Sequence, residues 1–184
     1  MRKKFCKIFL LIFAVTASGC TILGTKKNSL HESTKFVKTG IIVDAERIKK
    51  GGNLLIIPFK AGENVELNDQ IDKAALRIVK GISESLIDGD SNFKILLAHN
   101  ADEADIIIKG FITEFGTVPK WKKWGPFKKK ISLRIEGKMI DLKSQNTVCV
   151  FQDSRTTSKK EDDHNSLGLT IGRNIGQFIL SDDK

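Results

Sequence analysis

The chain has 184 residues, and its 31 lysine and arginine residues outnumber its 22 aspartate and glutamate residues, which gives a formal net charge of +9. Four of the positive charges lie within residues 1–19, a segment that contains no acidic residue. Without this segment the formal charge is +5, so overall basicity gives little support to a nucleic-acid-binding protein.

Residues 1–19 have the order of an export signal. A basic start precedes the apolar run IFLLIFAV (8–15), and the small residues ASG (17–19) precede Cys20. The apolar run is much shorter than the roughly 20 residues that span a bilayer. This order resembles a bacterial lipoprotein signal, which implies a palmitate-type lipid on Cys20. Thr21 then implies an outer-membrane lipoprotein that faces the periplasm, whereas an ordinary secretory signal is the alternative.

The cysteines and the polar segment after the signal indicate how the mature chain is organised. Cys6 leaves with the signal and Cys20 would carry lipid, so Cys149 is left alone and the fold must rest on a hydrophobic core rather than on an intramolecular disulfide. Cys149 lies in an apolar run and is expected to be a small buried hydrophobic residue. We expect residues 20–50 to form the lipidated cysteine and a flexible tether, with a short edge strand near its end, and residues 51–184 to form a single domain.

Residues 51–184 alternate between apolar runs and helical periodicity. A helix is predicted between a cap at Asn68 or Asp69 and a stop at Gly89, and a second helix over 166–181 with Ser166 as its N-cap. The polar turn KSQN (143–146) predicts a hairpin. Strands are predicted at 53–59, 93–98, 106–115, 131–142 and 147–157. The predicted fold is therefore an α+β layer sandwich of order β-α-β-β-β-β-α with an antiparallel meander.

Three segments of this domain carry a family resemblance. They are NLLIIPF (53–59), ADEADIIIKGFITEF (101–115) and LRIEGKMIDLKSQNTVCVF (133–151). They resemble a group of bacterial envelope lipoproteins that includes the curli-export channel lipoprotein and the outer-membrane activator of penicillin-binding proteins. The resemblance implies a non-enzymatic, membrane-tethered domain that binds or assembles with other proteins.

Catalytic and metal-binding patterns are weak in this sequence. The three histidines, His31, His99 and His164, have no ligand-like spacing, and the HExxH, GxSxG and P-loop motifs are absent. We therefore expect no enzyme activity, no metal and no cofactor apart from the covalent lipid. Export also makes nucleic acid an unexpected partner.

The segment VPKWKKWGPFKKK (118–130) holds six lysines and both tryptophans of the chain. It is too short and too basic for a membrane-spanning hairpin, which needs about 9–11 residues per strand. Three roles stay open: a solvated loop that protects a sheet edge, a membrane-surface contact, or a contact with an acidic protein or envelope polymer. The candidate contact residues are Lys120, Trp121, Lys122, Lys123, Trp124, Phe127, Lys128, Lys129 and Lys130.

Gly168, Gly172 and Gly176 recur every four residues on the last predicted helix. Such a stripe lets another backbone approach closely, and interior helix glycines cost about 1 kcal/mol each relative to alanine. The stripe is expected either to pack tightly on the domain's own sheet or to contact a second subunit in a homo-oligomer. The function expected overall is a protein-binding or assembly component of the envelope; the alternative is a lipid- or polymer-binding module that uses residues 118–130.

Overall fold

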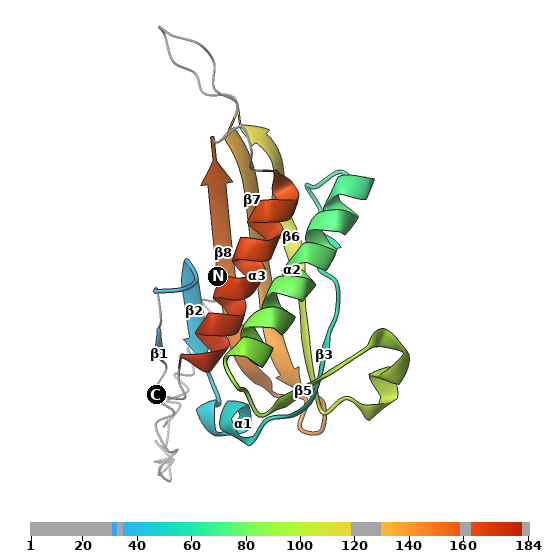
Figure 1. The fold of residues 1–184 in the computed structure, drawn as a ribbon, viewed down its shortest axis with the longest axis vertical. Coiled ribbons are helices and arrows are strands. Elements are labelled where there is room, and N and C mark those ends of the chain that lie inside the picture. Colours follow the sequence, from blue (N-terminus) through green and yellow to red (C-terminus); the bar gives the residue numbers. More distant parts are fainter. Residues whose placement is uncertain (1–30, 33–34, 119–129, 159–162, 182–184) are drawn as a thin grey trace, which may run out of the picture.

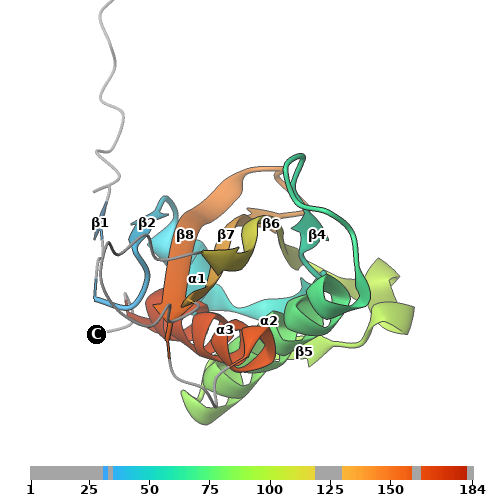
Figure 2. The same ribbon diagram turned by 90° about the horizontal axis from the view of Figure 1, so that it is seen from above.

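An eight-stranded mixed sheet carries two long helices on one face (Figures 1 and 2). The computed structural model describes residues 31–32, 35–118, 130–158 and 163–181. The strand order is β1-β2-β8-β7-β6-β3-β5, and β4 pairs with β6. Strand β3 is parallel to β5 and β6, whereas β6, β7 and β8 form an antiparallel meander. The elements are β1 His31–Glu32, β2 Thr39–Ile42, α1 Ala45–Lys50, β3 Gly52–Ile56, β4 Lys60–Ala61, α2 Asp69–Asp88, β5 Phe93–Leu96, the 3-10 segment η1 Ala98–Glu103, β6 Ile106–Val118, β7 Lys130–Asp141, β8 Thr147–Thr157 and α3 His164–Leu180. The predicted α+β layer sandwich is confirmed.

Both long helices begin at a side-chain cap. The Asn68 carboxamide oxygen accepts hydrogen bonds from the backbone N–H groups of Gln70 and Ile71 at 3.0 and 3.2 Å, and α2 ends at Gly89 as predicted. The prediction of Ser166 as the cap of α3 is wrong. Asp163 is the N-cap, and Ser166 is the third helical residue of a reciprocal capping box.

The N-terminal boundary of the domain lies earlier than the sequence pattern indicated. Strand β2 pairs with β8, and α1 follows it. Val37, Ile42 and Ile48 are all buried in the same core as the two long helices. Residues 35–50, which the sequence pattern assigned to the tether, therefore belong to the folded domain.

The hydrophobic core lies between the sheet and the helices, and its buried residues in the described chain fall between Val37 and Ile179. One row of residues that crosses the sheet contains three glycines. This glycine row consists of Gly40, Phe151, Gly137 and Gly110 on β2, β8, β7 and β6. The rings of Phe178, Phe151 and Phe59 occupy the space that side chains at the three glycines would fill.

Candidate functional site

Most of the residues predicted to make contacts lie outside the described chain. These are Cys20 and the part of the basic segment from Lys120 to Lys129. Lys130 is described: it is the first residue of β7, is partly exposed and pairs with Val118, the last residue of β6. The basic segment therefore connects the last residue of β6 to the first residue of β7, and these ends of the two paired strands lie away from α1 (Figure 1). Its role stays a prediction.

The glycine stripe of α3 faces α2 of the same chain. A Cβ at Gly168 would lie 2.8 Å from the Ala74 carbonyl oxygen, and a Cβ at Gly176 would lie 2.5 Å from the Ser85 Cβ. At the centre, a Cβ on Gly172 would lie 2.9 Å from the Cα of Gly81. All three glycines are buried. The stripe thus lets two helices of one domain approach closely, and its neighbour is α2 rather than the sheet.

The face of the sheet opposite the helices carries a groove that sequence reasoning missed. It has a volume of about 820 Å³ and crosses β2, β8, β7 and β6, with residues 57–60 at one end. Two rows of outward-facing side chains border it, and the glycine row lies between them. The lysine row is Ile41, Val150, Lys138 and Lys109; the phenylalanine row is Thr39, Gln152, Glu136 and Phe111.

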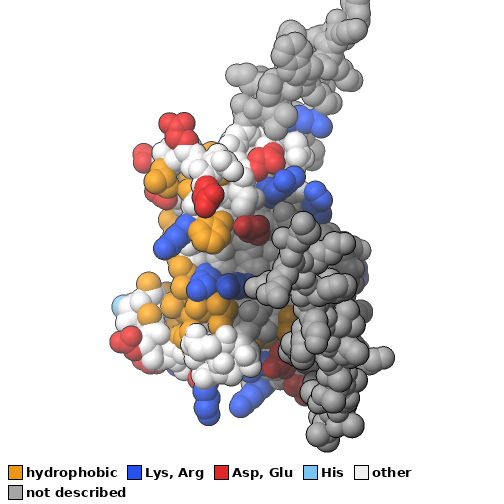
Figure 3. All heavy atoms as spheres, turned by 180° about the vertical axis from the view of Figure 1, so that it is seen from behind, with side chains coloured by type: hydrophobic (Ala, Val, Ile, Leu, Met, Phe, Trp, Pro, Cys, Tyr) orange, Lys and Arg blue, Asp and Glu red, His pale blue; other side chains and the backbone are white. Residues whose placement is uncertain are grey.

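The two ends of this outer groove differ in polarity. The β2–β8 end has Ile41 and Val150 beside two uncharged polar residues. At the β7–β6 end, Lys138 and Lys109 meet Lys60 of β4, and Glu136 is the one acidic residue of the lining. All four charged residues are exposed, and no ion pair within the described part of the chain involves them. Figure 3, which views this face, shows apolar side chains next to Lys and Arg side chains.

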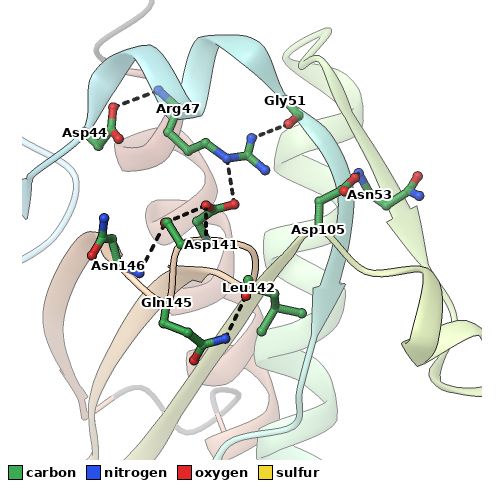
Figure 4. A network of polar contacts seen from close by, with 10 residues as sticks. Asp44, Arg47, Gly51, Asn53, Asp105, Asp141, Leu142, Gln145 and Asn146 are labelled. Carbon is green, nitrogen blue, oxygen red and sulfur yellow. Dashed lines mark hydrogen bonds and ion pairs between the residues drawn. The ribbon is translucent and has the colours of Figure 1, made fainter.

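A polar network joins α1 to the β7–β8 turn (Figure 4). Arg47 donates from Nε to Asp141 Oδ1 at 2.9 Å and from Nη1 to the Gly51 carbonyl oxygen at 2.6 Å. Asp141 Oδ2 also accepts hydrogen bonds from the backbone N–H and the hydroxyl of Ser144. The Ser144 hydroxyl, followed by Arg47, lowers the pKa of Asp141 below its ordinary value. Arg47 and the Asp141 carboxylate both find their partners within the domain, so we interpret this network as structural.

Two further groups that could have carried chemistry are also structural. Asp153 is buried, and its carboxylate accepts hydrogen bonds from the Ser154 backbone N–H and from Arg155 Nε at 2.9 and 3.0 Å. Burial raises the pKa of the Cys149 thiol to about 12, as expected for a buried hydrophobic cysteine rather than a nucleophile. Within the described ranges, no cluster of three His, Cys, Asp or Glu residues could hold a metal, and no helix is long and apolar enough to cross a bilayer.

Fold and surface together define a layered α+β domain with helices on one sheet face and a lysine-edged groove on the other. The comparisons agree in fold. A PelC variant from Paraburkholderia phytofirmans, solved as a dodecamer, matches with 14% identity over 70% of this chain and 89% of that chain, at a TM-score of 0.50. A second dodecameric PelC structure from the same organism has 15% identity over 72% of this chain and 89% of that chain, at 0.49. Lipoprotein GNA1162 from Neisseria meningitidis has 10% identity over 69% of this chain and 97% of that chain, at 0.46.

At these low sequence identities the comparisons concern the fold alone. Of the three, the first PelC structure, with a TM-score of 0.50, is the one that supports the fold. No protein-family model matches the chain, and no curated protein matches its sequence. Membership of the curli-export and penicillin-binding-protein activator group stays a prediction from the three sequence motifs.

Proposed function

We propose that the chain is an exported, lipid-anchored protein of the bacterial envelope that acts without catalysis, by assembling with other protein subunits. The observation that carries this proposal is a pair of exposed apolar side chains, Leu76 and Ile87, on the outward face of α2. Leu76 is 59% exposed and Ile87 is 66% exposed, and their spacing of eleven residues places them on the same side of the helix. Eleven residues span about 16 Å of helix axis, so we take the two side chains as separate apolar anchor points of the proposed contact surface rather than as one continuous patch.

Two further points support the proposal. The leader resembles a lipoprotein signal, which would hold the domain at a membrane surface through Cys20. The fold matches that of PelC, which was solved as a dodecamer. A surface on α2 suits a contact between copies of the chain or with another envelope protein, because the glycine face of the same helix is already occupied by α3.

Chemical cross-linking of the intact lipoprotein in its own envelope tests the assembly. We expect discrete cross-linked species with the natural chain and their loss in the double variant Leu76→Glu/Ile87→Glu. The matched control is Lys94→Gln/Lys143→Gln, which changes the net charge by the same amount at exposed positions away from α2. Mass spectrometry of the cross-linked species distinguishes a second copy from a different protein. Equal cross-linking in all three proteins would contradict the α2 surface.

The anchor is tested separately. Cys20→Ser should abolish incorporation of labelled palmitate and move the protein from the membrane fraction to the soluble fraction. An unchanged membrane fraction would contradict lipid anchoring at Cys20. The alternative function through residues 118–130 is tested with Trp121→Ser/Trp124→Ser in liposome sedimentation, where unchanged binding would exclude a membrane contact by the tryptophans.

A further inference from the structure

The outer groove has the dimensions of a ligand site. It runs across the strands from β2 to β6, which are three inter-strand spacings or about 14 Å apart. The two bordering rows are separated by two residues along each strand, or about 7 Å. Its volume of about 820 Å³ lies within the range of roughly 300–1,000 Å³ that is usual for small-molecule sites. The groove can therefore hold one extended chain that lies perpendicular to the strands.

The floor of the groove offers few hydrogen bonds. Gly110 and Gly137 lie opposite each other in the β6–β7 ladder, and Gly137 also lies opposite Phe151 of β8. Gly137 is thus paired on both sides, so its backbone groups are used within the sheet. A peptide that binds to a sheet needs free backbone groups at an edge. A hydrocarbon chain has no such need, and it gains from covering Val150, which is 36% exposed.

The charged end of the groove fits an anion. Lys60, Lys109 and Lys138 supply three positive charges, and Glu136 supplies one negative charge, so the local excess is two positive charges. A phosphate monoester carries about −1.5 to −2 charges at pH 7, which matches this excess. Lysine binds phosphate as a point charge and needs no bidentate geometry.

We propose that the outer groove binds a single-chain lipid with a phosphate head. The hydrocarbon chain lies over the β8 and β2 end, against Val150 and Ile41, and the phosphate lies among Lys60, Lys109 and Lys138. This site is on the opposite side of the sheet from α2. It goes beyond the assembly function and does not depend on it, so either proposal can fail while the other stands.

Calorimetric titration with dodecyl phosphate below its micelle concentration tests the site. Residues 21–184 can be used without the lipid anchor, because the whole core of the described chain lies between Val37 and Ile179. We expect saturable binding of one molecule per chain. The double variant Lys109→Gln/Lys138→Gln should weaken binding about tenfold, and Val150→Gln should also weaken it. The matched control, Lys73→Gln/Lys143→Gln, removes two exposed lysines that do not line the groove and should bind as the natural chain does.

Three related probes decide the chemistry of the head. Dodecyltrimethylammonium has the same chain with a positive head and should bind at least about tenfold more weakly. Equal binding of this cation would overturn the role of the lysines. Dodecanoate should bind more weakly than dodecyl phosphate, and equal affinity would overturn the preference for phosphate. Binding of hexaglutamate without binding of dodecyl phosphate would overturn the lipid in favour of an acidic peptide. Unaltered affinity in Lys109→Gln/Lys138→Gln would overturn the location.

Discussion

The substitution Gly172→Ala tests the close approach of α2 and α3. A Cβ at this position would lie 2.9 Å from both the Gly81 Cα and the Ile82 backbone nitrogen, and closer still to the Ile78 carbonyl oxygen. Ordinary contacts between carbon atoms are about 3.5–4.0 Å, so the helices would have to separate by roughly 1 Å. Because every one of these neighbours is a backbone atom, no side-chain rotation can relieve the overlap.

The expected decrease in the free energy of unfolding of Gly172→Ala is the balance of two opposing effects. Alanine is favoured over glycine in a helix by about 1 kcal/mol. Overpacking of a core costs typically about 1–3 kcal/mol, and a backbone overlap lies at the upper end of that range or beyond. We therefore expect Gly172→Ala to lower the free energy of unfolding by about 2 kcal/mol. Urea denaturation followed by far-UV circular dichroism measures this change, with an unchanged dependence on urea concentration as the check for two-state behaviour.

Gly176→Ala provides an internal comparison. Its new Cβ would meet the Cβ and Oγ of Ser85 at 2.5 and 2.8 Å, and both of these atoms belong to a side chain. Ser85→Gly should therefore relieve Gly176→Ala, with a coupling energy of about 1 kcal/mol. No such rescue is expected for Gly172→Ala. Gln177→Ala, at an exposed position of α3, should change stability by less than about 0.5 kcal/mol.

Two results would refute this reasoning. A Gly172→Ala protein as stable as the natural chain would mean that the helices do not meet at this point. A protein of unchanged stability but altered mass in size-exclusion chromatography would mean that the stripe contacts a second subunit instead of α2.

Three further predictions concern the core and the α1 network. Asp141→Asn should lower the free energy of unfolding by about 2 kcal/mol at pH 7, because Arg47 loses its ion pair. Since folding lowers the pKa of Asp141, this stabilisation is present above its ordinary pKa of about 4 and is lost as pH falls below it, so the difference between the two proteins in urea titrations should shrink as the pH falls below about 4. Phe151→Ala, which removes the ring over Gly137, should cost about 3–4 kcal/mol and lower the melting temperature by roughly 10 °C. Cys149 should react with a thiol reagent in urea but not in the native state, and Cys149→Ser should cost about 1–2 kcal/mol by burying a hydroxyl.

For each of these three predictions, one experimental result would contradict the reasoning. A difference between Asp141→Asn and the natural chain that stays constant from pH 7 to about pH 3 would contradict the lowered pKa. Melting temperatures that agree within a degree or two would contradict close packing by Phe151. Rapid labelling of Cys149 in the native protein would contradict its burial.

The sequence predicted an element well where the residues that start it and the residues that end it both lie within or next to that element. Asn68 and Gly89 bracket one continuous amphipathic run, so α2 could be predicted almost to the residue. Strand β8 occupies the predicted range 147–157 because the turn before it and the alternation within it are both local. The cap of α3 was misplaced since Ser166 is a good capping residue by itself. Its participation in a box with Asp163 depends on the register of the first turn.

Non-local pairing explains what the sequence could not show. Helix α1 spans six residues and buries a single one of them, Ile48, which is too little for a periodic pattern. The outer groove depends on the register that sets Lys109 beside Lys138 and Lys138 beside Val150. These residues are separated along the chain, and nothing near any one of them indicates the others. The neighbour of the glycine stripe was likewise unpredictable, because Gly81 lies far from Gly172 in sequence and gives no signal as an isolated glycine within a helix.

Helix α3 follows every other described element of this domain along the chain, and this order has a consequence for biosynthesis. Chains are made from the N-terminus, and α2 is complete about 75 residues before the start of the helix that covers its glycine face. Until His164–Leu180 emerges, the buried side of α2 around Gly81 has no neighbour to protect it, and the apolar surface of the sheet is open as well. An emerging or truncated chain is therefore prone to aggregate until the seventeen residues of α3 arrive. The final helix acts as the closing step of folding, and any nonsense or frameshift change before residue 164 should yield an aggregating product rather than a shortened working domain.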